Sequence, residues 1–380
     1  MLAVIVALVL VAGGLAARSA LWYETADFFC LYQGARSLVI GLDPYDEVAW
    51  RSTVGGPYPD PRGGVAMPPC PGRYGYPLWS AVLLVPLGAL PIEIASSLWM
   101  AVSIGAAVLG SALAWRAFGG TSRYAGIFGV SVVMSQPFWI FLLSGQSSGM
   151  LLGLAGTVAW AIARERERLG GVALALLAFK PQTSVITIPV VFFQALATRR
   201  RRFIVAATVA AALLIVVPLL FVRDWPFEWL GEVSGRRLRV ITQMPTAWGF
   251  AAQTVGDATW GAAFLAGTAL VTALIAWGRA DRVTVFVLTL PLSLLATPYA
   301  WTYDYLVLAV AWGFILARAE AGPPVTRTAL LAAGLSLAVI LPWVLYALSF
   351  TRGEEALSAT LAAATAVVGA CAARVRRREG

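Results

Sequence analysis

The sequence predicts an all-α membrane protein that crosses the bilayer many times, and three observations lead to that prediction. Apolar residues make up 59% of the 380 residues and charged residues only 12%, and the mean hydropathy is +0.79. A soluble domain carries about 25% charged residues, so a water-exposed surface could not be covered here. The apolar residues also gather in runs of helical length separated by arginines. A soluble nucleic-acid-binding protein could share the pI of about 9.9 but not this hydropathy, so nucleic acid is not an expected partner.

Thirteen apolar runs are candidates for membrane-spanning helices, each of which needs about 20 apolar residues. They cover residues 1–17, 78–91, 94–115, 124–143, 149–163, 169–180, 183–197, 203–222, 258–277, 283–297, 305–318, 327–350 and 356–373. The first run is interpreted as an anchored helix, because no basic segment precedes it and no clear cleavage site follows it. Several others are short and broken by Pro or Gly, as expected beside a cavity rather than against lipid. The run at 124–143 contains Pro137, so two half-helices are an alternative there.

The distribution of the arginines predicts which ends of these helices face the cytoplasm. Six basic segments hold 17 Arg and five acidic residues, a net charge of +12, while the rest of the chain carries −3. The basic segments are 116–123, 164–168, 199–202, 279–282, 318–327 and 374–379. This asymmetry is the positive-inside pattern, and it predicts that both termini are cytoplasmic.

The same charge pattern predicts which segments lie outside. They are the first outer loop (18–77), the second outer loop (223–257) and the short turns at 298–304 and 351–355. Two cytoplasmic termini require an even number of crossings. The short 78–91 run is therefore predicted to be re-entrant or interfacial, in a single integral membrane domain over 1–380 with about twelve spans.

Two residue counts exclude whole classes of chemistry. The chain has no His, which removes His-ligated zinc, Ser-His-Asp hydrolysis and imidazole acid–base catalysis. With only three Cys, a thiolate metal cage is not expected either, so neither a metal nor a cofactor is predicted. Cys30 and Cys70 fall in the first outer loop, where a disulfide is permitted, but sequence does not supply their separation. Cys371 is expected to be a buried small apolar residue.

The first outer loop combines acids with many aromatic residues. The aromatic residues argue against disorder and favour short helices at the membrane interface; they are Trp22, Tyr23, Phe28, Phe29, Tyr32, Tyr45 and Trp50. Asp43 and Pro44 form a turn signal. Asp27 follows the first helix by about one turn among apolar neighbours, where a desolvated carboxylate can take up a proton. It is a candidate general base, and the alternative is an ordinary interfacial acid or a helix N-cap.

The second outer loop carries expected interface anchors at Trp225, Phe227 and Trp229. A cationic cluster follows them, made of Arg236, Arg237 and Arg239. Arg can clamp phosphate through its bidentate guanidinium fork, and it can equally bind anionic lipid head groups. Both interpretations of this cluster stay open.

Two polar positions lie at the outer ends of predicted spans. Gln146 is in L-S-G-Q-S-S-G, and Lys180, the only Lys of the chain, is in A-F-K-P-Q. An ionisable group at membrane depth is a functional candidate by default. Lys180 could neutralise a phosphate leaving group, with Pro181 breaking the helix and Gln182 beside it. The alternative is that Lys180 extends to the lipid head groups.

The turn T-P-Y-A-W-T-Y-D-Y at 297–305 places Asp304 beside Trp301 and Tyr303. Aromatic faces next to a carboxylate suit a sugar ring, although an aromatic belt at the membrane interface has the same composition. Asp43 and Tyr45 are grouped with these three residues as candidates for binding the acceptor or the sugar.

Taken in order, these pieces resemble glycosyltransferase family 87, a branch of the GT-C superfamily of membrane glycosyltransferases. The resemblance lies in Asp27 and in G-L-D-P-Y-D, G-Y-P-L-W-S-A-V-L-L-V-P-L, G-Q-S-S-G-M-L-L, G-G-V-A-L-A-L-L-A-F-K-P-Q and T-P-Y-A-W-T-Y-D-Y. It covers nearly the whole chain.

The resemblance implies a GT-C-type bundle in a bacterial plasma membrane, with an extracytoplasmic active site and no metal requirement. The implied substrates are a polyprenyl-phosphate sugar, with mannose as the first candidate, and a lipid or glycan acceptor. It also implies that Asp27 is the general base and that Gln146 and Lys180 line the donor pocket. The family usually carries His at the position of Tyr303. Either Tyr303 takes over a hydrogen-bonding role or the acceptor preference differs, and phosphate binding is then expected to rest more on Lys180 and the Arg236–Arg239 cluster.

The predicted function is therefore an inverting hexosyl transfer. Two alternatives are considered: a lipid or sugar transporter (flippase), and a polymerase or ligase of lipid-linked glycans. Transporters usually consist of two related halves, and no such repeat is visible, since Lys180 has no counterpart near residue 350. The polymerase or ligase would keep the same side of the membrane and change the acceptor.

Overall fold

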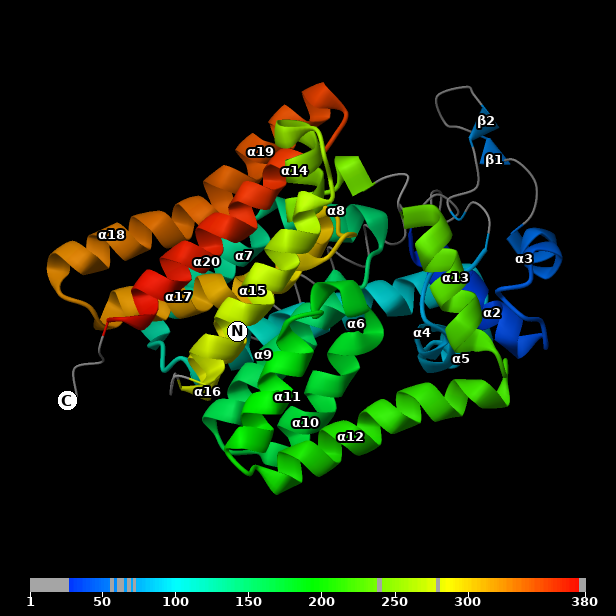
Figure 1. The fold of residues 1–380 in the computed structure, drawn as a ribbon, viewed down its shortest axis with the longest axis horizontal. Helices are drawn as coiled ribbons and strands as arrows, with labels where there is room; N and C mark the ends of the chain where they lie inside the picture. Colours follow the sequence, from blue (N-terminus) through cyan, green and yellow to red (C-terminus); the bar gives the residue numbers. More distant parts are fainter. Residues whose placement is uncertain are drawn as a thin grey trace. The chain divides into compact units, whose positions relative to one another are not determined.

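The computed structural model describes residues 27–54, 58–59, 65–66, 70, 73–237, 241–277 and 281–375 (Figure 1). The predicted first helix at 1–17 lies outside these residues. The chain divides into two compact units. Unit 1 comprises Met1–Gly105, Leu142–Ser147 and Ala211–Leu238, and unit 2 comprises Ala106–Phe141, Ser148–Ala210 and Arg239–Gly380. A single membrane domain over 1–380 stays a prediction.

Unit 1 contains the first outer loop, which folds mainly into short helices as predicted. Its elements are α2 (Phe28–Val39), α3 (Glu47–Val54), β1 (Tyr58–Pro59), β2 (Val65–Ala66), α4 (Leu78–Leu83), α5 (Val85–Gly88), the first part of α6 (Ile92–Ala117) and α13 (Trp225–Arg237). The two strands were not expected; they pair antiparallel with Tyr58 opposite Ala66. The 78–91 run forms α4 and α5, which are both too short to cross a membrane, in agreement with its assignment as a non-spanning segment.

Several aromatic residues of unit 1 form its core, whereas Phe227, expected to be an interface anchor, is 78% exposed. The Tyr74 ring packs against Tyr45 and against Trp50, in each case with ring centroids 5.8 Å apart, and all three residues are at most 1% exposed. Trp225, expected to be an interface anchor, is 2% exposed in the same core. A small unit gains most of its stability from buried apolar area, and here the large rings supply that area.

A disulfide joins Cys30 of α2 to Cys70, across 40 residues of chain. The backbone oxygen of Cys70 also accepts a hydrogen bond of 3.2 Å from Trp50 Nε1. The bridge therefore ties α2 to the segment that follows the strands. Disulfides persist in oxidising compartments, which agrees with an outer position for this loop.

Unit 2 is helical throughout the described residues. Its α-helices are the remainder of α6, α7 (Ser122–Val133), α8 (Gln136–Ser144), α9 (Ser148–Ala163), α10 (Glu167–Leu176), α11 (Thr187–Ala197), α12 (Arg201–Val216), α14 (Ala247–Val255), α15 (Trp260–Trp277), α16 (Arg282–Ala296), α17 (Ala309–Ala321), α18 (Pro324–Leu335), α19 (Leu341–Arg352) and α20 (Ala359–Ala373). The end of α8 and the end of α12 belong to unit 1. Its short helical turns are η2 (Leu177–Phe179), η3 (Pro181–Thr183), η5 (Ile241–Gln243), η6 (Thr302–Leu308), η7 (Ser336–Ile340) and η8 (Ala356–Ser358), whereas η4 (Val217–Leu220) belongs to unit 1.

Four described helical segments are long and apolar enough to cross a membrane. They are Ile92–Ala117, Arg201–Leu220, Pro324–Ser349 and Ala356–Ala373. A fifth candidate is the pair α7 and α8, which is bent by 52°. Pro137 explains the bend, because proline removes a helical hydrogen bond and clashes with the preceding turn. The alternative of two half-helices at 124–143 is therefore confirmed, whereas a total of about twelve spans stays a prediction.

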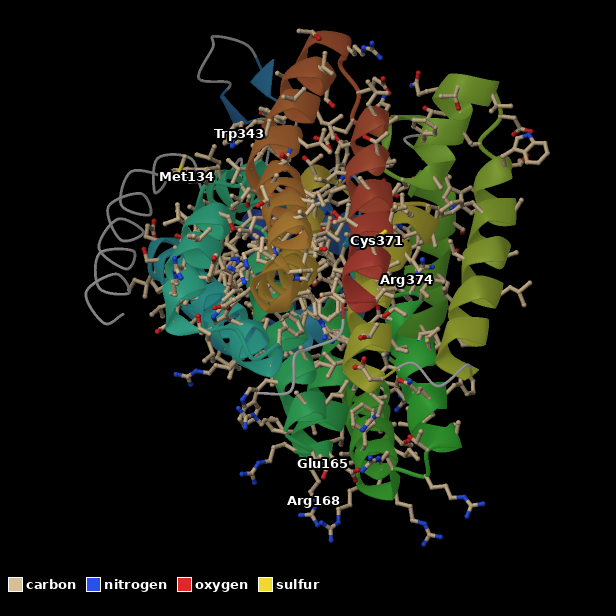
Figure 2. All side chains as sticks on the ribbon, turned by 90° about the vertical axis from the view of Figure 1, so that its left-hand side faces the viewer. Met134, Glu165, Arg168, Trp343, Cys371 and Arg374 are labelled. Atoms are coloured by element: carbon tan, nitrogen blue, oxygen red, sulfur yellow. A yellow bond between two sulfur atoms is a disulfide. The ribbon has the colours of Figure 1, made fainter. Side chains whose placement is uncertain are left out.

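The bend between α7 and α8 is bridged from a distant helix. Trp343 Nε1 donates a hydrogen bond of 2.8 Å to the backbone oxygen of Met134, which lies at the break. Figure 2 labels both residues. The backbone oxygens at a helix end need partners from outside the helix, and this indole supplies one.

Cys371 is exposed on α20 (Figure 2), which corrects the expectation that it is buried. The buried residues in this half of α20 include Thr365, Gly369 and Ala372, which follow one another at intervals of four and three residues. These intervals mark one face of a helix. Cys371 lies off that face.

The predicted basic segments contact one another in unit 2. Arg200 Nη1 lies 3.2 Å from Glu167 Oε1, which joins the 199–202 segment to the 164–168 segment. The Arg282 guanidinium lies 5.0 Å from the ring centroid of Phe203, which directly follows the 199–202 segment, and Thr121 N donates to Glu320 at 3.0 Å. Segments assigned to one side by charge therefore meet in pairs in the fold.

Helices α6 and α9 touch through their backbones at glycines. A Cβ added at Gly156 would lie 2.0 Å from the Gly110 oxygen, and one added at Gly110 would lie 2.3 Å from the Leu152 oxygen. Small residues allow this close approach, as in membrane helix pairs generally. Neither position can accept a side chain unless the helices separate.

We predict that Gly156→Ala lowers the melting temperature of the purified protein, because overpacking costs about 1–3 kcal/mol. The matched control is Gly126→Ala in α7, where an added Cβ would meet no atom within 4 Å. Ala is favoured over Gly in a helix by about 1 kcal/mol, so this control should unfold at the same temperature as wild type or higher. Equal effects of the two substitutions would contradict the close α6–α9 contact.

Candidate functional site

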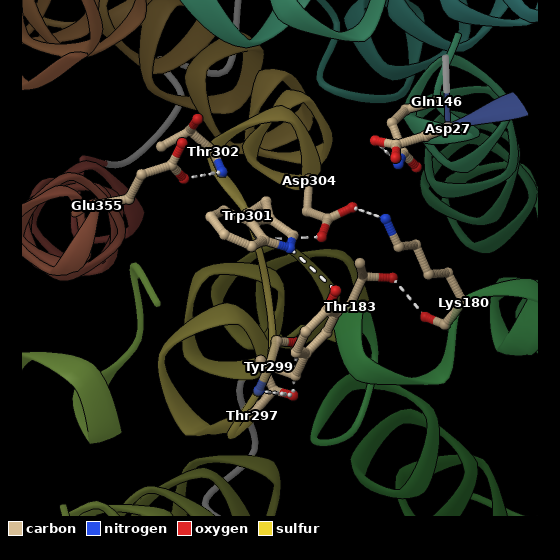
Figure 3. Close-up of polar contacts among 10 residues, drawn as sticks. All are labelled: Asp27, Gln146, Lys180, Thr183, Thr297, Tyr299, Trp301, Thr302, Asp304 and Glu355. Atoms are coloured by element: carbon tan, nitrogen blue, oxygen red, sulfur yellow. Dashed lines mark hydrogen bonds and ion pairs between the residues drawn. The ribbon is translucent and has the colours of Figure 1, made fainter. Parts of the chain in front are cut away.

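Two groups of polar residues lie among the apolar helices, one in each unit. The first contains Asp27 and Gln146 of unit 1, and the second contains Lys180, Asp304 and their neighbours in unit 2 (Figure 3). Buried polar groups are expected to have hydrogen-bond partners, and the partners define what each group can do.

Asp27 precedes α2 and is held at both its backbone and its side chain. Its backbone N–H donates to the Ser144 oxygen at 2.9 Å, and its Oδ2 accepts from Gln146 Nε2 at 2.6 Å (Figure 3). Asp27 occupies the N-cap position of α2, but its side chain makes no capping hydrogen bond. The alternative of a simple side-chain N-cap is therefore wrong, because the carboxylate is turned toward Gln146.

Gln146 sits on a turn that the surrounding residues fix in place. Gly145 before it has φ +66°, a left-handed conformation that glycine adopts without strain. Trp99 Nε1 donates to the Gly145 oxygen at 2.7 Å, and the Trp99 ring stacks on Phe28 at 5.3 Å. The side chain of Gln146 is 1% exposed, so its amide is aimed at Asp27 by packing.

The carboxylate of Asp27 is oriented by these contacts and is partly exposed. The hydrogen bond from Gln146 orients the Asp27 carboxylate, and an ionised carboxylate is a group that can accept a proton. A fixed, partly exposed carboxylate is the geometry that a general base requires.

Lys180 and Asp304 form a buried ion pair in unit 2. Lys180 Nζ lies 2.5 Å from Asp304 Oδ1, and the two side chains are 2% and 0% exposed (Figure 3). The other oxygen, Oδ2, accepts from Trp301 N at 3.1 Å. Two residues predicted for different roles, donor binding and sugar binding, are thus partners of each other.

The chain around Lys180 departs from regular helix, as Pro181 predicted. Helix α10 ends at Leu176, and the short turns η2 and η3 lie on either side of Lys180. Gln182, in η3, is 7% exposed. Thr183 Oγ1 donates to the Lys180 oxygen at 2.8 Å, so the freed backbone is satisfied locally. The alternative that Lys180 reaches the head groups is wrong, since its ammonium is buried against Asp304.

The aromatic residues of the 297–305 turn surround this pair on one side. The Tyr303 ring lies with its centroid 4.5 Å from Lys180 Nζ, within range of a cation–π interaction. Trp301 Nε1 donates to the Tyr299 hydroxyl at 3.0 Å. Tyr303, at the position where the family usually has His, therefore contacts the lysine, and both Trp301 and Tyr303 remain partly exposed.

Glu355 is a carboxylate of this group that the sequence did not single out. Its Oε2 accepts from Thr302 N at 2.9 Å, and its own N–H donates to the Gln243 oxygen at 2.9 Å. Thr302 Oγ1 in turn accepts from the buried Gln136 at 3.3 Å. The assignment of 298–304 and 351–355 to one side was the only signal for this contact.

The remaining predicted residues divide into three cases. Asp43 Oδ1 accepts a hydrogen bond from Tyr45 N at 2.9 Å. Burial raises the pKa of Asp43 by more than this hydrogen bond lowers it. Tyr45 donates its hydroxyl to the Tyr76 oxygen at 2.6 Å inside the core, so its ring and hydroxyl are both committed there. For Arg236 and Arg237 only the backbone, at the end of α13, is described, and Arg239 lies outside the described residues.

Burial also raises the pKa of Glu228 in α13, and repulsion between the Glu228 and Asp43 carboxylates raises it further. Glu228, Asp43 and Arg73 therefore share one electrostatic environment in unit 1. Within the described ranges, no three His, Cys, Asp or Glu side chains are arranged to hold a metal ion.

Long apolar helices with buried, mutually bonded polar side chains define a helical membrane protein with a polar interior. A model of glycosyltransferase family 87 matches residues 74–298, more than half of the chain. The chain belongs to glycosyltransferase family 87, as the resemblance implied, and is a glycosyltransferase. No match was found among curated proteins. The matched range contains Gln146 and Lys180, whereas Asp27 and the Trp301–Asp304 residues lie outside it.

We predict that removing one partner of the buried ion pair destabilises the protein more than removing both charges. Lys180→Met should cost about 3–5 kcal/mol, because an uncompensated charge is left buried. Adding Asp304→Asn should recover most of this loss, since Asn keeps an acceptor for Trp301 N. The measurement is unfolding of both variants and wild type in the same detergent. Additive losses in the double variant would contradict a direct ion pair.

The raised pKa of Glu355 predicts that the stability of the folded protein depends on pH. Burial raises the pKa of Glu355 by more than the hydrogen bonds from Thr302 lower it. The folded protein therefore binds this proton more tightly than the unfolded chain, and ionisation at neutral pH destabilises the fold. Glu355→Gln should melt at a higher temperature than wild type at neutral pH, and the difference should shrink as pH falls. The exposed Glu93→Gln is the control, and a difference that grows on acidification would contradict the assignment.

Proposed function

We propose that this glycosyltransferase transfers a hexose, with mannose as the first candidate, from a polyprenyl-phosphate donor to a lipid or glycan acceptor. The observation that carries the proposal is the Asp27 carboxylate, which Gln146 and the Ser144 backbone hold at the start of α2. Within a glycosyltransferase, a fixed carboxylate of this kind suits the task of activating an acceptor hydroxyl.

The proposed reaction takes place on the extracytoplasmic face of a bacterial plasma membrane. The Cys30–Cys70 disulfide supports an oxidising location for the loop that carries Asp27. The contacts among basic segments support a common cytoplasmic side for them. The proposal includes a GT-C-type bundle of about twelve spans with both termini in the cytoplasm.

In the proposed step, Asp27 takes the proton of the acceptor hydroxyl. The acceptor oxygen forms a bond to the anomeric carbon of the donor sugar. The bond between that carbon and the phosphate oxygen breaks on the opposite face, and its electron pair leaves with the polyprenyl phosphate. The anomeric configuration is inverted, and general-base assistance of this kind contributes about 10²–10⁴-fold to the rate.

Lys180 is proposed to stabilise the negative charge on the departing phosphate. Its burial supports this role, because electrostatic interactions are stronger where water is excluded. Asp304, whose two oxygens accept from Lys180 and Trp301, is proposed to orient the lysine rather than to contact the sugar. Gln182 and the Arg236, Arg237 and Arg239 cluster remain proposed donor-binding residues.

Partly exposed aromatic residues are proposed to bind the acceptor or the sugar. Trp301 and Tyr303 present ring surface next to the ion pair, and a sugar packs its C–H face on such rings. Asp43 is proposed as a hydrogen-bonding partner in unit 1. Tyr45 belongs to the core and is left out of the proposed acceptor contacts.

We predict that Asp27→Asn abolishes glycosyl transfer while the protein still folds and binds its donor. Asn is nearly isosteric, but its amide does not accept a proton at neutral pH. The measurement is mass spectrometry of lipid products after incubation with polyprenyl-phosphate sugars and a cell lipid extract, beside donor binding. The matched control is Asp224→Asn, which changes an exposed acid of the same unit.

Transfer by Asp27→Asn at the wild-type rate would contradict the assignment of the base. Equal loss in both variants would assign the effect to charge rather than to position. Lipid flux across vesicles without any glycosyl product would favour the transporter alternative, and extension of a lipid-linked glycan would favour the polymerase or ligase.

A further inference from the structure

A pocket of about 590 Å³ opens where α6 and α9 end in unit 2. It is lined by Arg116, Trp160, Arg164 and Arg166. Arg116 lies in the last turn of α6 and Trp160 in the last turn of α9, Arg164 directly follows α9, and Arg166 precedes α10. Three guanidinium groups and one indole therefore converge on a single concavity of the basic side. The glycosyl-transfer proposal uses none of these residues.

The close contact between α6 and α9 brings these helix ends together. Gly110 and Gly156 allow the two backbones to touch. Arg116 lies six residues after Gly110 and Trp160 four after Gly156, so both follow the contact within two helical turns. The position of the pocket is thus a consequence of a packed, rigid helix pair rather than of a long loop.

The α9–α10 turn is held in an unusual conformation that separates Arg164 from Arg166. Arg166 N donates to the Ala161 oxygen at 2.8 Å and Glu165 N to the Ile162 oxygen at 3.3 Å, which is the Schellman pattern of a helix end. The left-handed position of this motif is normally Gly, but here it is Glu165 with φ +53°. Backbone strain at a non-glycine residue often accompanies a functional site.

The two acidic residues of this turn, Glu165 and Glu167, form ion pairs with Arg200. Arg200 lies 3.7 Å from Glu165 Oε1 and 3.2 Å from Glu167 Oε1. Figure 2 shows Glu165 at this end of unit 2. Within the described residues, the guanidinium groups of Arg116, Arg164 and Arg166 have no hydrogen bond or ion pair. The pocket therefore carries three positive charges that have no direct acidic partner among the described residues.

Two ordinary explanations account for part of this arrangement. Arg at the C-terminal end of a helix complements the helix dipole, and basic residues on one side orient a membrane protein. Neither explanation requires three arginines around one pocket with an indole in its wall. Arg fits the geometry of phosphate through bidentate hydrogen bonds, and Trp prefers the head-group region of a bilayer.

We propose that this pocket binds a phosphate group, carried by an anionic phospholipid of the same leaflet. The position at the ends of apolar helices favours a lipid over a soluble phosphate, because these ends lie near the head groups. None of the residues proposed for sugar transfer lines this pocket.

The test measures binding of phosphatidylglycerol to the purified full chain in phosphatidylcholine nanodiscs, by native mass spectrometry. Inorganic pyrophosphate is titrated in parallel as the soluble probe. The pocket variant combines Arg116→Gln, Arg164→Gln and Arg166→Gln. The control variant combines Arg168→Gln, Arg201→Gln and Arg202→Gln, which remove the same charge from exposed positions outside the pocket lining. Figure 2 shows Arg168 on the same basic end.

The pocket variant should bind phosphatidylglycerol at least about tenfold more weakly than wild type, because even one lost charge-assisted hydrogen bond has that effect. The control variant should stay close to wild type. Selective weakening of pyrophosphate instead would support the phosphate site with a soluble ligand. Equal weakening in both variants, or no binding of either probe to wild type, would overturn the proposal. Arg164→Gln alone repeats the comparison if the triple variant does not fold.

Discussion

A charge buried away from water is stable only beside a partner, and this constraint organises the polar interior of unit 2. Lys180 and Asp304 come from segments 124 residues apart, yet their side chains are nearly inaccessible and lie 2.5 Å from each other. Placing them there requires α10 to end early and the 297–305 turn to fold back in a short helical turn. The desolvation of two charges is offset only when geometry and further hydrogen bonds are good. Trp301 and Tyr303 provide those further contacts.

The broken helices follow from the same constraint. Irregular backbone at membrane depth is tolerated where the protein itself supplies hydrogen-bond partners. Trp343 supplies one at the bend between α7 and α8, and Glu355 supplies one at the start of η6. In unit 1, the turn that carries Gln146 is held by Trp99 and by the backbone of Asp27. Each break is thus paired with a partner from a distant part of the chain, and the resulting rigidity is what a proposed catalytic group needs.

The pattern of apolar residues and the positions of proline predicted the local structure well. Pro137 and Pro181 marked real interruptions, and the 78–91 run gave short helices as expected. Predictions that depended on the environment of a side chain were weaker. Aromatic residues of both outer loops were expected at the membrane interface, but Tyr45 of the first loop and Trp225 of the second pack in a core. An aromatic ring has the same hydrophobicity in both environments, so composition cannot distinguish them. Cys371 was misplaced for a related reason, since which face of α20 is covered depends on its neighbours.

The sequence by itself determined the class of protein, because low charge and long apolar runs permit little else, and its ordered motifs indicated the glycosyltransferase family. It also identified Asp27, Gln146, Lys180 and Asp304 as polar residues in apolar surroundings. Only the tertiary structure decided which of them are partners. Gln146 meets Asp27 across 119 residues, Lys180 meets Asp304, and Glu355 joins through Thr302 across 53 residues. Local patterns extend over a few helical turns, whereas these contacts depend on how whole helices pack, and packing is decided by side-chain shape along the entire chain.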